Sequence, residues 1–166
     1  MRCKIGVTVA ALVVGASVLA RAQTAPSLQG VWRVNEVVVT GANAATNRSP
    51  QPSLYVFTRQ HYSIMTVNGT APRKDFGTPK DPAKLTDAEK SARYDAWDAF
   101  TANSGTYQVS GSTLTTRPLV AKNPGVMTGP AATRAFRIEG NTLTLIQKSA
   151  AGQPVSETTI KLTRVE

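Results

Sequence analysis

Gly30-Val31-Trp32 opens the first of a series of short segments that have the composition of β-strands. The first, Leu28 to Thr40, is rich in β-branched residues and ends at a glycine. Seven more follow, several separated by tight turns such as Glu139-Gly140-Asn141: residues 54–58, 62–67, 106–109, 113–120, 131–138, 142–148 and 155–165. Eight antiparallel strands with one apolar face form a sandwich or a closed barrel. Because closure removes both sheet edges, we predict a mainly β, eight-stranded barrel.

One α-helix is expected, between the third and fourth of these strands. Thr86-Asp87-Ala88-Glu89 is a capping box, in which Thr86 and Glu89 satisfy free backbone amides of the first turn. The helix is predicted to end near Asn103-Ser104-Gly105, and the Pro-containing residues 71–84 lead into it. Its shallow apolar face suits packing on a sheet or across an opening, as a lid; this face comprises Leu85, Ala88, Ala92, Ala96, Ala99 and Phe100, with Trp97 at its edge.

Residues 1–22 have the pattern of a signal peptide. Arg2 and Lys4 precede an apolar stretch, Ile5 to Leu19, and Ala20-Arg21-Ala22 forms a cleavage site. The stretch is shorter than the roughly 20 residues that a membrane-spanning helix needs, although an uncleaved anchor is the alternative. We therefore expect one exported domain, residues 23–166, in the periplasm or secreted.

Composition excludes several classes of site in the exported part. It holds no cysteine, because Cys3 lies in the leader, so its core must stabilise it. Removing Arg2, Lys4 and Arg21 from 19 basic residues leaves 16 against 10 acidic ones, and a scattered charge of about +6 is typical of a solvated surface rather than a nucleic-acid site. His61 is the single histidine, which excludes a His/Cys zinc site. We expect no metal and no cofactor.

The order of the motifs resembles the lipocalin-like domain proteins, a bacterial and fungal group related to lipocalins in architecture. Asn141 stands where that family carries Asp, and Thr115-Thr116 stand where it often carries His. The similar segments are Leu28-x-Gly30-x-Trp32, then residues 54–57, 62–65, 104–109, 134–138 and 140–145. The resemblance implies a calycin-type barrel and an apolar small-molecule ligand, and it implies no definite activity.

Trp32 is expected to close the floor of the barrel together with Gly30 and Arg164. In such a barrel the start of the first strand lies beside the end of the last, which brings Arg164 near Trp32. A guanidinium stacked on an indole contributes roughly 0.5–2 kcal/mol. The resemblance to lipocalins implies this role for Trp32 and Arg164, and contact between Trp32 and a ligand is the alternative.

Two charged residues share strand faces with apolar ones. By alternation Glu36 lies on the face of Trp32, and Arg134 lies on the face of Phe136. If those faces are interior, each charge needs a partner or a polar group of a ligand, and the pair could orient a carboxylate or a carbonyl. The alternative places both side chains at the rims, in water.

Aromatic and methionine side chains are candidates for the walls of a ligand cavity, although they would equally fill a small barrel. They are Tyr55, Phe57, Tyr62, Met65, Tyr107 and Phe136. We therefore predict an exported protein, monomeric or weakly dimeric, that binds a small apolar or amphipathic molecule. No sequence feature supports contact with a membrane surface. The alternatives are a barrel enzyme for acid/base isomerisation or cyclisation, with Glu36 and a tyrosine as the reacting groups, and a filled barrel that serves as an envelope interaction module.

Overall fold

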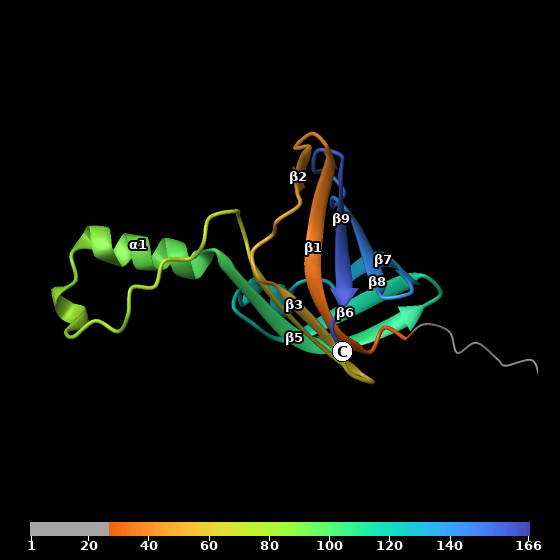
Figure 1. Ribbon diagram of the computed structural model, residues 1–166, viewed down its shortest axis with the longest axis horizontal. Helices are drawn as coiled ribbons and strands as arrows, with labels where there is room; N and C mark the ends of the chain where they lie inside the picture. Colours follow the sequence, from red (N-terminus) through yellow and green to blue (C-terminus); the bar gives the residue numbers. More distant parts are fainter. Residues whose placement is uncertain (1–26) are drawn as a thin grey trace, which may run out of the picture.

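Nine strands form one antiparallel sheet in the computed structural model, which describes residues 27–166. The predicted leader lies outside the described residues. The strand order is β2-β1-β3-β4-β5-β6-β7-β8-β9, and β1 also pairs with β9, so eight strands close a barrel and β2 is an extra strand beside β1 (Figure 1). The bounds are β1 Gly30–Gly41, β2 Ala45–Asn47, β3 Leu54–Phe57, β4 His61–Val67, β5 Phe100–Ser110, β6 Thr113–Ala121, β7 Ala132–Glu139, β8 Thr142–Lys148 and β9 Ser156–Arg164. The predicted eight-stranded antiparallel barrel is confirmed.

The main difference from the prediction lies where the helix meets the fourth barrel strand. Helix α1 (Asp87–Asp98) ends before residue 100, and β5 begins at Phe100 rather than at Thr106. The expected helix end near residues 103–105 is therefore wrong. Phe100 pairs with Val67 and Thr101 with Thr66 in β4, so a neighbouring strand supplies the hydrogen bonds that another helical turn would otherwise have made.

Helix α1 projects away from the barrel, at the end of the segment that joins β4 to β5 (Figure 1). Its predicted capping box is present: the Thr86 hydroxyl accepts from the Glu89 amide at 3.3 Å, and the Glu89 carboxylate accepts from the Thr86 amide at 2.8 Å. No residue of α1 is buried. The alanine face therefore neither packs on the sheet nor covers the barrel opening, contrary to the expectation from its pattern. We call residues 70–98 the arm.

Two short helices complete the fold. A single 3₁₀ turn, η1 (Pro82–Lys84), begins at Asp81, whose carboxylate accepts from the Ala83 amide at 3.0 Å. Helix α2 (Gly125–Thr128) lies between β6 and β7 and was not expected from the sequence. Neither helix contains a buried residue.

A β-bulge in β1 changes which side chains point into the barrel. Val34 pairs with Leu162 in β9, but Glu36 pairs with the next residue, Lys161, so Asn35 is the extra residue. Beyond the bulge Val37 faces Ile160 and packs against the core, and Glu36 lies on the outer face beside Lys161. The prediction that Glu36 shares a face with Trp32 is therefore wrong. Strict alternation fails because a bulge inserts one residue into one strand only.

The floor half of the barrel is filled by apolar side chains. Arg164 lies over the Trp32 ring with its guanidinium carbon 4.1 Å from the ring centroid, so the predicted stacking is confirmed. Gly30 has φ +132°, and a Cβ there would collide with the carbonyl oxygen of Glu166, so glycine lets the chain end close over the first strand. The buried apolar residues are Leu28, Trp32, Val34, Tyr55, Phe57, Tyr62, Ile64, Leu114, Leu143, Leu145 and Leu162.

Candidate functional site at the barrel mouth

A hollow lies at the mouth of the barrel, above the filled floor. Its volume is about 250 Å³, slightly below the range usual for small-molecule sites. Side chains from β1, β3, β4 and β9 supply the inner wall, and the segment between β2 and β3 supplies one side. We call it the mouth hollow; the residues of its wall used below are Val34, Val37, Tyr55, Thr66, Asn68 and Ile160.

Arg134 points into the barrel from β7. It shares its strand face with Phe136 and Ile138, which pack against the core. Its Nε donates to Oε1 of Gln147 at 3.0 Å, and its Nη1 donates to Oγ1 of Thr116 at 3.4 Å. All six ion pairs within 4.0 Å among residues 27–166 involve other residues. The guanidinium is therefore held by neutral groups and has no counter-charge in the described part of the chain.

Two tyrosines lie within the field of this charge. Burial raises the pKa of Tyr55 and of Tyr62, and the positive charge of Arg134 acts in the opposite direction on both. Both phenols are therefore protonated at neutral pH. The Tyr62 hydroxyl donates to Oδ1 of Asn103 at 2.8 Å, across the β4–β5 pair. Tyr55 lines the mouth hollow, and among the hydrogen bonds of residues 27–166 none involves its hydroxyl.

Glu36 does not join this cluster. On the outer face its carboxylate lies 2.6 Å from the Lys161 ammonium and 3.4 Å from the Arg48 guanidinium. The hydrogen bond from Lys161 holds the pKa of Glu36 below its usual value, and the charges of Lys161 and Arg48 act in the same direction. The predicted inward pair of Glu36 and Arg134 is therefore not formed: the bulge sends one residue outward and leaves the other inside.

The remaining candidates divide between the floor and the outer surface. Phe57 and Tyr107 stack edge to face with ring centroids 5.3 Å apart, and the Tyr107 hydroxyl donates to the Thr58 carbonyl at 2.6 Å. Phe136 is half-buried and packs against the core. Met65 pairs with Leu54, and both are exposed on the outer face of the barrel. Of the six candidates for a cavity wall, Tyr55 and Tyr62 feel the charge of Arg134, and Phe136 shares its strand face.

Sequence reasoning missed the partners of Arg134. Thr116 is two residues after Leu114, and Gln147 is two residues after Leu145. Both therefore continue the inward alternation of buried leucines, and Thr116 is itself buried. The signal was a polar residue at the inward position that follows a buried leucine. It indicates a change from filled floor to polar mouth.

Among residues 27–166, no group of three or more His, Cys, Asp or Glu side chains is placed to hold a metal ion. In the same residues, none of the helices has both the length and the apolar character needed to cross a membrane.

Comparison with known proteins does not show a family for this chain. No protein-family model matches the chain, and no curated protein matches it. Among solved structures, an uncharacterized protein from Bacteroides eggerthii DSM 20697 is similar over 83% of this chain and 99% of its own, with 8% sequence identity and a TM-score of 0.45. The resemblance to lipocalin-like domain proteins therefore stays a prediction from the motifs.

Proposed function

We propose that the protein is an exported binding protein that holds a small amphipathic molecule at the barrel mouth. The polar end of the ligand, a carboxylate or another anionic group, bonds to Arg134. Its apolar part lies against the wall of the mouth hollow, including Val37 and Ile160. The observation that carries the proposal is the inward guanidinium of Arg134 without a counter-charge among residues 27–166.

The physical reason is the energy of a partly buried cation. Removing a charge from water is costly unless a partner compensates it, and hydrogen bonds between two charged groups are stronger than those between a charge and a neutral group. Gln147 and Thr116 give Arg134 only neutral acceptors. An anionic ligand would supply the missing charge, and the Tyr55 hydroxyl offers it a further hydrogen bond.

The alternative of a barrel enzyme loses support at specific residues. A reaction inside the barrel cannot use Glu36, because that carboxylate lies on the outer face with Lys161. Tyr55 and Tyr62 have raised pKa values and are poor bases at neutral pH. The interaction module keeps its support from the filled floor. The experiment must therefore distinguish a barrel mouth that binds a ligand from one that binds none.

Two related dyes test the proposal. 8-Anilinonaphthalene-1-sulfonate is anionic, and N-phenyl-1-naphthylamine has the same aromatic framework without the charge. We expect the anionic dye to bind more tightly to the wild-type protein, and Arg134→Gln to reduce its affinity at least tenfold while changing that of the neutral dye less than threefold. Arg137→Gln is the matched control, because it removes the same charge from the outer face of the same strand.

If Arg134→Gln and Arg137→Gln reduced the affinity for the anionic dye equally, the proposal would be contradicted, since surface charge alone would then explain the affinity. Absence of binding of either dye to the wild-type protein would favour the interaction module instead. Native mass spectrometry of protein purified from its own host gives an independent measurement. A co-purified anionic amphiphile that is lost in Arg134→Gln would identify the ligand class.

A further inference from the structure

A second and larger hollow lies where the arm joins the barrel. It is a groove of about 540 Å³, within the range of small-molecule sites. Its walls come from the last turn of α1, the start of β5, the end of β6 and the residues that lead into α2. Nothing in the proposed function uses it. We call it the arm-base groove.

Two aromatic side chains of α1 line the groove and remain open to solvent. Tyr94 and Trp97 are one helical turn apart, and they are 64% and 53% exposed. No other aromatic residue is among the exposed large hydrophobic ones of residues 27–166. Aromatic faces carry partial negative charge and attract the partly positive C–H groups of a ligand laid flat on them.

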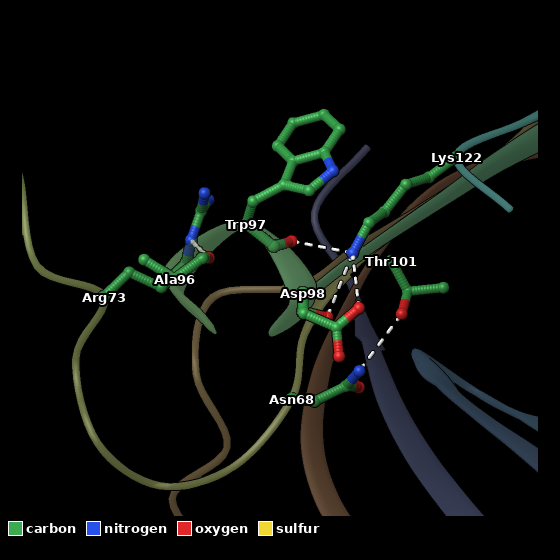
Figure 2. Close-up of polar contacts among 7 residues, drawn as sticks. All are labelled: Asn68, Arg73, Ala96, Trp97, Asp98, Thr101 and Lys122. Atoms are coloured by element: carbon green, nitrogen blue, oxygen red, sulfur yellow. Dashed lines mark hydrogen bonds and ion pairs between the residues drawn. The ribbon is translucent and has the colours of Figure 1, made fainter. Parts of the chain in front are cut away.

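Amide side chains on the opposite walls have one end fixed by the protein. Nδ2 of Asn68 donates to the Thr101 hydroxyl at 3.0 Å (Figure 2), and its oxygen makes no hydrogen bond among residues 27–166. Oδ1 of Asn103 accepts from Tyr62, and Oδ1 of Asn123 accepts from the Gly125 amide at 3.0 Å, so their amino groups stay available. The groove thus presents oriented donors and an oriented acceptor, as recognition of hydroxyl groups requires.

The charge in the groove is already neutralised. The Lys122 ammonium donates to the carbonyls of Trp97 and Asp98 at 2.7 and 3.1 Å and to the Asp98 carboxylate at 3.3 Å (Figure 2). Its side chain is only 15% exposed. The ammonium therefore bonds to the last carbonyls of α1 and stabilises its last turn. It is already compensated and does not need an anionic ligand. Arg134, by contrast, has no counter-charge among residues 27–166. The compensated charge of Lys122 favours a neutral ligand in the groove.

We propose that the arm-base groove binds a neutral saccharide. One face of a pyranose ring, which is rich in C–H groups, stacks with Tyr94 beside it on the part of Trp97 that is not covered by the Lys122 ammonium, which lies 5.3 Å from the ring centroid. The ring hydroxyls bond to the free ends of Asn68, Asn103 and Asn123 and to the carboxylate oxygen of Asp98 that Lys122 does not hold. The groove shares Asn68 with the wall of the mouth hollow but does not include Arg134, and its ligand is of a different chemical class.

The test is titration with neutral oligosaccharides of glucose, mannose, galactose and N-acetylglucosamine, two to four units long. Trp97 and the buried Trp32 are the two tryptophans, so saturable changes in the emission of exposed tryptophan report on Trp97. We expect binding of at least one series, a loss of tenfold or more in Trp97→Ala, and a smaller loss in Trp97→Phe, which keeps an aromatic face. Since Trp97→Ala removes its own signal, affinities of the variants are measured by calorimetry.

Arg134→Gln is the control, and it should leave saccharide affinity unchanged. Circular dichroism should show that Trp97→Ala stays folded, because the side chain is half exposed. The proposal is overturned if none of the four series binds, if Trp97→Ala binds as well as the wild type, or if sulfated saccharides bind far more tightly than neutral ones. The last result would assign the groove to anions through Lys122.

Discussion

The guanidinium of Arg164 lies over the indole of Trp32 and joins the two ends of the domain at the barrel floor. Besides the stacking, its Nη1 donates to the Gln29 carbonyl and its Nη2 to the Ser27 carbonyl, each at 2.6 Å. The Trp32 indole in turn donates to the Leu28 carbonyl at 2.8 Å. One side chain from the last strand therefore holds the chain that enters the first strand, which is how the floor is closed.

Arg164→Ala should destabilise the barrel by about 2–4 kcal/mol, because it removes the cation–π contact and two hydrogen bonds from a charged donor. Arg164→Lys should recover only part of this, since an ammonium lacks the planar fork. Urea unfolding measures both. Arg117→Ala, at an exposed position of β6, should change the free energy of unfolding by less than about 0.5 kcal/mol. A loss for Arg164→Ala no larger than this control would show that the floor is closed by Trp32 alone.

Gly105→Ala should destabilise the barrel by about 1–3 kcal/mol or more, because a Cβ there would collide with the Arg117 carbonyl and with backbone atoms of Pro118 and Leu119. The close approach is at the register shift between β5 and β6. Gly111→Asn is the control: nothing lies within 4 Å of its Cβ position, and asparagine tolerates its φ of +56°. Thermal unfolding that shows equal effects for the two variants would contradict the predicted collision.

Thr86→Ala should weaken the helix of the arm by about 1 kcal/mol through loss of its N-cap. Since no residue of α1 is buried, we expect faster hydrogen exchange and faster proteolysis within the arm, with little change in global unfolding of the barrel. Ser91→Ala removes a hydroxyl from the same helix without touching the cap, and it should not accelerate exchange. If Thr86→Ala lowers global stability instead, the arm is coupled to the barrel more strongly than its contacts indicate.

Glu36 makes a contribution to stability that depends on pH. Its pKa in the folded protein is lowered from the ordinary 4.5, chiefly by the hydrogen bond from Lys161. The carboxylate therefore stabilises the folded state above about pH 4.5, and this stabilisation is lost as the pH falls through the lowered pKa. The effect is small because the pair lies at the surface.

Glu36→Gln should accordingly narrow the difference in unfolding temperature between pH 7 and pH 3. Glu139→Gln, which removes a carboxylate 3.7 Å from Arg137 elsewhere on the barrel, gives the reference for the loss of one surface charge. The pairing with Lys161 would be refuted by a Glu36→Gln variant that has the same pH profile as the wild type.

Local chemistry determined most of the architecture in advance. Alternating apolar residues bounded by glycine turns predicted the strands, the Thr86–Glu89 capping box predicted the start of α1, and the position of Arg164 relative to Trp32 predicted the floor. These features depend on residues close in sequence or on closure of the barrel. The amino-acid sequence is therefore enough to predict them.

Only the tertiary structure decided which side chains meet at the mouth. A single extra residue, Asn35, turns Glu36 outward, and no local pattern marks it because bulges are set by the fit of β1 against β9. The end of α1 is decided likewise by the pairing of Phe100 with Val67, and none of the residues of α1 is buried against the described part of the chain. The pairing between strands distant in sequence set the register. Because of that register, Arg134 points into the barrel and Glu36 does not.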